Sequence, residues 1–231
     1  MLTRARLINW RFLSLSFLVI LLGCDQLESE QAVGVSSKSK IANYQEARSI
    51  FWRGVYPSGF DTLYCGVKGK DPRKVQANIE HVFPMSWVTN ALDCGTRKQC
   101  RDNDKFNQIE SDLHNLYPAL TQINKVRSSF KFGMVAGESR DYGARCDFEL
   151  DTRQRAVEPR PAVRGDIARA MFYMQNRYGD LGLKIFSKQA ALLKEWHLED
   201  PPDAEEQRRN DTIERLQGNR NPYIDEPSSL R

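Results

Sequence analysis

The chain of 231 residues has few of the residues that build structural metal sites: three histidines, five cysteines and no Cys-x-x-Cys pair. Zinc sites commonly use such pairs at regular spacing, so their absence argues against one. Internal repeats and long low-complexity segments are also absent. The composition therefore favours a single folded domain with short extensions.

No hydrophobic run is long enough to cross a bilayer as a helix. Three arginines and no acidic residue precede an apolar run over residues 12–22, which is typical of a signal peptide. We assign residues 1–23 to this peptide, because Leu21-Leu22-Gly23-Cys24 resembles a bacterial lipobox and predicts that Cys24 is acylated. The alternative is an ordinary signal peptide that is cleaved further along.

The segment after Cys24 is rich in Ser, Gln and charge, which predicts a flexible tether over residues 24–43. Residues 44–231 then form one domain of about 190 residues, which is ample for a hydrophobic core. We expect this domain to be exported, either on the periplasmic side of a membrane as a lipoprotein or secreted, and to act as a monomer.

The net charge is too small to argue for a nucleic-acid partner. The formal charge is +4, and three of the positive residues lie in the leader. Its distribution is more informative, because residues 65–146 carry 13 Lys and Arg against 9 Asp and Glu, whereas residues 195–231 carry 5 against 10. A basic middle segment of this kind attracts phosphates.

Four cysteines remain once Cys24 is assigned to lipid, namely Cys65, Cys94, Cys100 and Cys146. An even number in an exported chain indicates two disulfides, for which three pairings are possible. A zinc site is the competing interpretation of the same residues.

Two short motifs carry residues suited to metal-assisted hydrolysis. Glu80 and His81 lie side by side at the end of an apolar stretch, and Asn124 follows the string Asn115-Leu116-Tyr117-Pro118 in a helical pattern. Glu80 and Asn124 can supply the oxygen ligands that a hard cation such as Mg²⁺ requires. A neutral His81 is suited to take a proton from an attacking water molecule.

Neighbouring residues of a regular strand point to opposite faces of a sheet. Glu80 and His81 can therefore face one site only if the strand ends there. Pro84 follows shortly after, which indicates that it does end.

These strings resemble the bacterial endonuclease I family of ββα-metal (His-Me finger) nucleases. The resemblance also includes Gly95-Thr96-Arg97-Lys98-Gln99-Cys100, Arg164-Gly165-Asp166 and Gln217-Gly218-Asn219-Arg220-Asn221-Pro222-Tyr223. The matching strings cover roughly residues 44–223 in one order. The resemblance implies a largely sequence-nonspecific endonuclease that acts on DNA and RNA and leaves 5′-phosphates.

The resemblance also implies a role for each site residue. His81 would be the general base, Glu80 and Asn124 would hold one Mg²⁺, with Mn²⁺ or Ca²⁺ as alternatives, and Arg97 would contact the phosphate through its planar guanidinium. Asn115 would be structural. Disulfides would join Cys94 to Cys100 and Cys65 to Cys146.

The predicted fold is α+β: a mostly helical single domain around a ββα-metal core, with a small antiparallel sheet. Apolar spacing and end signals predict helices over residues 44–55, 106–116, 119–130, 164–178, 183–198 and 203–216, and short strands near 62–66, 79–83 and 147–150. In the fourth helix, Ile167, Met171 and Met174 share one face and are assigned to the core.

The remaining histidines and nearby acids receive structural assignments. We assign His114 and His197 to packing rather than to a metal site with His81. Glu110 and Asp112 are assigned to the surface of a helix, with a role through water in the outer shell of the metal as the alternative.

Two other functions fit the same residues. One is a noncatalytic nucleic-acid-binding surface lipoprotein on the same scaffold, and the presence of Glu80, His81 and Asn124 together argues against it. The other is a metallohydrolase that acts on a different phosphodiester, such as a lipid headgroup.

Overall fold

The computed structural model describes residues 39–230. The predicted signal peptide, Cys24 and most of the predicted tether lie outside these residues. Within the described part, no helix is both long enough and apolar enough to cross a membrane.

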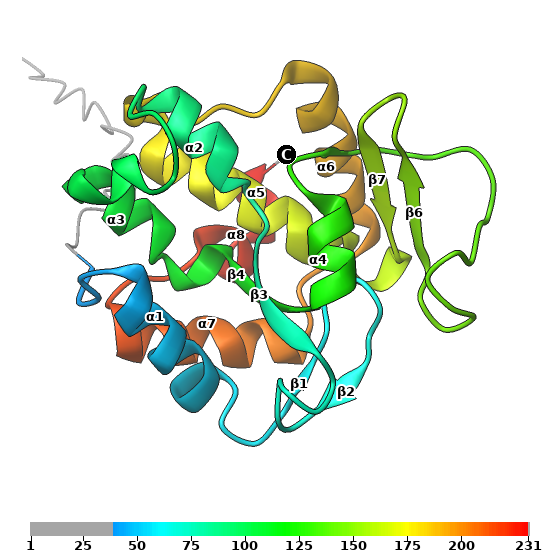
Figure 1. Cartoon of the computed structure of the whole chain (residues 1–231), viewed down its shortest axis with the longest axis horizontal. Helices are drawn as coiled ribbons and strands as arrows, with labels where there is room; N and C mark the ends of the chain where they lie inside the picture. Colours follow the sequence, from blue (N-terminus) through cyan, green and yellow to red (C-terminus); the bar gives the residue numbers. More distant parts are fainter. Residues whose placement is uncertain (1–38, 231) are drawn as a thin grey trace, which may run out of the picture. The chain divides into compact units, whose positions relative to one another are not determined.

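Helices are the main elements of the described chain (Figure 1). The α-helices are α1 (Tyr44–Ile50), α2 (Met85–Ala91), α3 (Asp104–Glu110), α4 (Thr121–Arg127), α5 (Arg164–Tyr178), α6 (Ser187–Glu199), α7 (Ala204–Gln217) and α8 (Pro222–Asp225). A π-helical turn (Phe51–Val55) continues α1, and short 3₁₀ turns include Gln99–Asp102, Leu113–Asn115 and Pro161–Val163.

Residues at helix ends explain where α1 and α7 begin and end. The Asn43 side chain accepts the Glu46 N–H, and the Glu46 carboxylate in turn accepts the Ala42 N–H, so the two side chains cap α1 reciprocally. Asp203 caps the start of α7. Gly218 ends α7 with φ +99°, a left-handed conformation that favours glycine.

The strands β3 (Ala77–His81) and β4 (Leu116–Leu120) form an antiparallel pair, and α4 follows β4 directly. The register places Glu80 opposite Tyr117 and His81 opposite Leu116. Helix α4 packs against β3. This ββα unit is the part of the fold that carries the predicted site residues.

The prediction of helix over residues 116 and 119–120 was wrong, because these residues form β4. Pro118 lies in the middle of the strand, opposite Ile79. Its missing N–H interrupts no second ladder, because β4 pairs only with β3 among the described strands. The Pro118 carbonyl accepts the Leu63 N–H at 2.7 Å, so at least one acceptor of β4 is satisfied by a segment other than β3.

Two further sheets are small. β1 (Phe60–Asp61) and β2 (Lys68–Gly69) pair antiparallel, and the residues between them form a turn, so the predicted strand over residues 62–66 was wrong. The other sheet has the order β5 (Lys131–Phe132), β7 (Ala156–Pro159), β6 (Phe148–Asp151), in which β6 and β7 are antiparallel and β5 and β7 parallel. The predicted strand near residues 147–150 is confirmed as β6.

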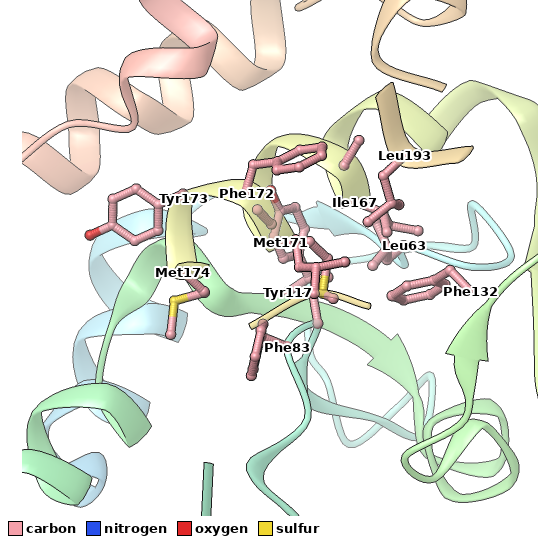
Figure 2. Packing of buried hydrophobic residues seen from close by; sticks show 14 of the residues in the cluster. Leu63, Phe83, Tyr117, Phe132, Ile167, Met171, Phe172, Tyr173, Met174 and Leu193 are labelled. Atoms are coloured by element: carbon pink, nitrogen blue, oxygen red, sulfur yellow. The ribbon is translucent and has the colours of Figure 1, made fainter. Parts of the chain in front are cut away.

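Helix α5 provides much of the hydrophobic core, and its predicted range is confirmed. Ile167, Met171 and Met174 are each 0 % exposed, so the predicted core face is also confirmed. Figure 2 shows these side chains gathered with Leu63 and Leu193. The core therefore packs α5 and α6 against Leu63 in the turn between β1 and β2.

The start of α5 requires glycine. The Gly165 N–H donates to the Asp200 carboxylate at 2.9 Å, and a Cβ at Gly165 would lie 1.9 Å from the Asp200 carbonyl oxygen. No side chain fits in that space, and this explains the glycine in Arg164-Gly165-Asp166.

Packing extends upstream of α1 into the segment predicted to be a tether. Ile41 is only 3 % exposed and belongs to a hydrophobic cluster with residues of α1 and α7. The Lys40 N–H donates to the Gln217 carbonyl at 3.1 Å. The last residues before α1 are therefore part of the folded domain.

Both predicted disulfides are present. Cys94 is joined to Cys100 and Cys65 to Cys146. The first closes the short loop that carries Arg97, and the second joins the segment between β1 and β2 to the loop before β6.

Candidate functional site

A cleft of about 790 Å³ lies between α1, the end of β3, the start of α2 and α4. All four residues predicted to do chemistry line it: Glu80, His81, Arg97 and Asn124. They come from β3, from the loop closed by Cys94–Cys100, and from α4. The fold therefore brings together residues that are up to 44 positions apart in the sequence.

His81 is the last residue of β3, and a hydrogen bond fixes which of its nitrogens carries the proton. Its Nε2 lies 2.9 Å from the backbone carbonyl oxygen of Glu110. A carbonyl can only accept, so Nε2 donates and Nδ1 is the basic nitrogen of the neutral ring. Burial, followed by the charge of Arg97, lowers the pKa of His81 to about 3. At neutral pH the ring is therefore an uncharged base.

Asn115 explains why β3 ends where it does. This residue is 0 % exposed, and its side chain accepts the Phe83 N–H at 2.6 Å and donates to the Phe83 carbonyl at 3.1 Å. These bonds hold the turn in which the chain leaves β3 and enters α2 after Pro84. The structural role predicted for Asn115 is confirmed, and Glu80 and His81 both line the cleft at this strand end.

Glu80 is nearly buried, at 3 % exposure. Its Oε1 accepts the Tyr64 hydroxyl at 2.7 Å and lies 3.1 Å from Nη1 of Arg127. Burial raises the pKa of the Glu80 carboxyl, while Arg127 and the Tyr64 hydroxyl oppose the rise. Both of these contacts use Oε1, and the His81 backbone N–H also bonds the carboxylate. A carboxylate has about four lone-pair sites, so Glu80 keeps acceptor capacity for a cation.

Asn124 on α4 is oriented by the strand beside it. Its Nδ2 donates to Oδ1 of Asn78 at 2.9 Å and to the Ile79 carbonyl at 3.1 Å. Because the Ile79 carbonyl can only accept, the atom facing it must be the amide nitrogen. Both amide hydrogens are thus used, and Oδ1 is the atom that remains for a cation.

The two oxygens, one from a carboxylate and one from an amide, are hard donors on neighbouring elements. Mg²⁺ is commonly held by only one or two protein ligands together with water and phosphate oxygens. Glu80 and Asn124 therefore fit a Mg²⁺-type ion, and they fit Mn²⁺ or Ca²⁺ by the same chemistry.

Arg127 belongs to the basic segment that was expected to attract phosphates, but it is buried and its contacts are with the protein itself. It lies one turn after Asn124 and is 1 % exposed. In addition to Glu80, its guanidinium contacts the carbonyls of His81 at 3.2 Å and Val82 at 2.7 Å. It therefore ties α4 to the end of β3. The spacing of Asn124 and Arg127 on one helix face is the sequence signal that could have indicated this.

Arg97 is positioned by Glu110. Its Nε donates to Oε1 of Glu110 at 2.6 Å, and its guanidinium lies over the Tyr44 ring, 5.4 Å from the centroid. The Arg97 side chain is still 44 % exposed, so it can reach a ligand in the cleft. Glu110 thus holds Arg97 through its carboxylate and His81 through its carbonyl.

The assignment of Glu110 and Asp112 to a helix surface was wrong, since each is only 1 % exposed. Asp112 accepts hydroxyl hydrogens from Tyr173 at 2.8 Å and Tyr178 at 2.7 Å. Both carboxylates find partners in distant segments, and short-range sequence patterns do not contain that information.

The other two histidines lie apart from the cleft lining. Nε2 of His114 bonds the Asn219 carbonyl at 3.0 Å, and Nε2 of His197 bonds the Pro227 carbonyl at 2.8 Å. The prediction that both are packing residues is confirmed.

Exposed arginines surround the catalytic candidates. Arg48, Arg73 and Arg101 line the cleft together with Arg97. Arg73, Arg97 and Arg101 belong to the basic segment noted in the sequence. Arg48 was missed, because it lies upstream of that segment on α1.

A comparison with known protein families identifies the family to which this chain is similar. Residues 23–228 match the model of the family described as Endonuclease I. The chain belongs to the endonuclease I family. The match includes α5 to α8 as well as the cleft, so similarity to the family is not confined to the site.

Three relatives illustrate the range of the endonuclease I family. An extracellular deoxyribonuclease of Aeromonas hydrophila is 40% identical over 167 residues, which cover 70% of this chain and 71% of that protein. A periplasmic deoxyribonuclease of the same species is 36% identical over 196 residues, 74% and 81% of the two chains. An extracellular ribonuclease of Bacillus subtilis (strain 168) is 35% identical over 167 residues, 65% and 51%.

Proposed function

We propose that this member of the endonuclease I family is a metal-dependent, largely sequence-nonspecific endonuclease that hydrolyses DNA and RNA to 5′-phosphate products. Relatives named deoxyribonuclease and ribonuclease support a nuclease with both kinds of substrate. The words extracellular and periplasmic in their names support an exported protein.

The observation that carries the proposal is the hydrogen bond from Nε2 of His81 to the Glu110 carbonyl. It holds a neutral imidazole in the cleft with Nδ1 as its basic atom. In the reaction, Nδ1 accepts a proton from a water molecule as the water oxygen attacks phosphorus. His81 thereby becomes positively charged, and the cleft must return this proton to solvent before the next cycle.

Glu80 and Asn124 would hold a single Mg²⁺-type ion. When bound, such an ion stabilises the charge that develops on the phosphate and on the leaving oxygen. Tyr64 and Arg127 hold Oε1 of Glu80, so that the carboxylate is oriented before any ligand arrives. This pre-orientation lowers the ordering cost of binding.

Arg97 would contact the phosphate at or next to the cleavage position. Glu110 uses Nε of Arg97, so the Nη groups are the ones that would bind phosphate oxygens. Arg48, Arg73 and Arg101 would bind neighbouring phosphates. Contacts of this kind carry no sequence information, which fits a nonspecific nuclease.

Digestion of plasmid DNA by the purified protein tests the proposal. We expect cleavage with Mg²⁺, none with EDTA, and ends that can be labelled by a kinase only after phosphatase treatment. Glu80→Ala should require more Mg²⁺ than the wild type, whereas Glu195→Ala, an exposed carboxylate on α6, should not. Equal Mg²⁺ requirements for Glu80→Ala and the wild type would contradict the ligand role.

The leader carries a separate part of the proposal, in which an acylated Cys24 fastens the exported enzyme to a membrane. One acyl chain binds membranes only marginally, whereas several chains give stable attachment. Labelling with a fatty acid, followed by membrane fractionation, should find the wild type labelled and membrane-bound, and Cys24→Ser unlabelled. An unlabelled wild type found wholly in the soluble fraction would make the enzyme a free secreted nuclease.

A further inference from the structure

A second group of carboxylates lies on strand β6 and on the loop that precedes it, away from the cleft. Glu138 and Asp147 belong to the loop between β5 and β6, and Glu149 belongs to β6. One carboxylate oxygen of each lies within 4.8 Å of the others. None of the three lines the cleft that contains His81. Figure 1 shows β6 beside β7 at one edge of the domain.

Glu149 is the unusual member of this group. It is 4 % exposed, and its Oε1 has no hydrogen-bond partner among the described residues. The residue opposite on β7 is Glu158, whose carboxylate already accepts the Val135 N–H and pairs with Arg164. Burying a carboxylate without a partner lowers the stability of the folded protein. The position of Glu149 is therefore suited to a bound metal cation.

Arg140 is the basic residue that pairs with this group. Its Nη1 lies 2.5 Å from Oδ1 of Asp147, and its Nη2 lies 3.7 Å from Oε2 of Glu138. Its ion pairs among the described residues are with these two carboxylates and not with Glu149, so one guanidinium compensates only part of the charge of the group. The Arg140 side chain is 44 % exposed, and ion pairs of that exposure are weak. It can therefore move away when a cation binds.

We propose that Glu138, Asp147 and Glu149 form a calcium site that fastens the loop between β5 and β6 to strand β6. Ca²⁺ binds oxygens at about 2.3–2.6 Å, so two ligands on opposite sides of the ion lie about 4.6–5.2 Å apart. Each pair of these carboxylate oxygens is no more than 4.8 Å apart, so the three lie close enough together to share one ion of this size. Mg²⁺ has shorter bonds and favours one or two carboxylates with several waters, so a group of three carboxylates selects Ca²⁺.

The position of the site indicates what the ion would do. Cys146 lies in the same loop and is joined to Cys65, which fastens the end of the loop next to β6. Glu138 lies eight residues earlier, beyond the reach of that bond. A calcium ion would therefore fix the part of the loop that the disulfide leaves to weaker contacts. The expected effect is on stability, with little effect on Mg²⁺-dependent cleavage.

Calcium-dependent thermal unfolding tests the proposal. Glu80→Ala serves as the background, because it removes the carboxylate proposed to bind a cation in the cleft. In this background, CaCl₂ at about 5 mM should raise the Tm by roughly 5 °C, as expected for a site with the modest affinity of extracellular calcium modules. The same concentration of MgCl₂ should raise it less.

Glu149→Gln in the same background should abolish the rise in Tm. Asp141→Asn, an equal charge change at an exposed position of the same loop, should preserve it. Arg140→Gln removes the competing guanidinium, so its Tm should respond at lower CaCl₂. Binding of radioactive calcium to Glu80→Ala gives the stoichiometry directly, and one ion per chain is expected.

Three results would overturn the calcium site. One is a rise in Tm that persists in Glu149→Gln, and another is the absence of both a rise and calcium binding in the Glu80→Ala background. The third is an Arg140→Gln variant whose response is unchanged or weaker, because the carboxylates would then belong to a permanent ion-pair group. None of these results bears on Mg²⁺-dependent cleavage, so the proposed nuclease function is tested separately.

Discussion

Replacing Asn115 by alanine should loosen the turn that ends β3. The side chain is fully buried, and both of its hydrogen bonds go to the backbone of Phe83. Alanine would leave a buried N–H and a buried carbonyl without partners. Each such group costs about 1–3 kcal/mol, so the free energy of unfolding should fall by about 2–6 kcal/mol.

Loss of the two hydrogen bonds should also lower the rate of cleavage, because His81 is only two residues before Phe83. Cleavage per folded molecule should therefore fall in Asn115→Ala, since the imidazole no longer has a fixed position. Urea unfolding, followed by circular dichroism, measures the stability, and plasmid cleavage measured well below the transition measures the activity. The matched control is Asn90→Ala, an exposed residue of α2.

A specific result would refute this reasoning. If Asn115→Ala and Asn90→Ala unfold within about 0.5 kcal/mol of each other, the turn does not depend on the two hydrogen bonds. The end of β3 would then need another explanation, such as the proline that follows it.

Two further predictions concern packing and pH. Gly165→Ala should lose more than about 2 kcal/mol of stability, because its Cβ would lie 1.9 Å from the Asp200 carbonyl oxygen, whereas Gly133→Ala meets only an ordinary 3.5 Å contact. Equal melting temperatures for these two variants would contradict the close approach. Burial lowers the pKa of His114 to about 4 in the folded protein. Between pH 6.5 and 4, His114 is therefore protonated in the unfolded chain but mostly neutral in the folded chain. The free energy of unfolding should therefore fall by about 3 kcal/mol between pH 6.5 and 4 through this residue alone. His114→Gln should have a shallower pH dependence in urea unfolding, and an unchanged slope would contradict the assignment.

Sequence periodicity predicted which residues are buried better than it predicted the backbone that carries them. Phe106, Ile109, Leu113 and Leu116 have helical spacing, and all four are 0 % exposed. The chain nevertheless changes from α3 to a 3₁₀ turn and then to β4 within this stretch. Strand β4 forms only because β3 lies beside it, and a local pattern cannot include that partner.

The long helices were predicted more accurately, because their ends carry local signals. α7 begins at the Asp203 cap and ends at Gly218, and both residues can be read directly from the sequence. Their hydrogen bonds join neighbours in the chain, so no distant contact is needed to place them.

In the candidate site, too, local motifs predicted which residues take part, whereas contacts between distant segments determine how they are oriented. Glu80, His81 and Asn124 were predicted from motifs, and the fold brings them into one cleft. Their orientation depends on Tyr64, on Arg127 and on the Glu110 carbonyl, through contacts between separate segments. A bond to a backbone carbonyl leaves no sequence signature, so the fixed tautomer of His81 could be found only in the structure.

The central claim is that His81 is the general base of a Mg²⁺-dependent phosphodiester hydrolysis. The most direct measurement is the single-turnover rate of DNA cleavage by His81→Ala at saturating Mg²⁺, with DNA binding and thermal unfolding measured on the same preparation. We expect a rate loss of about a hundredfold or more, with nearly unchanged DNA affinity, because the base acts only on the attacking water. A correctly folded variant that keeps more than about a tenth of the wild-type rate would contradict the claim.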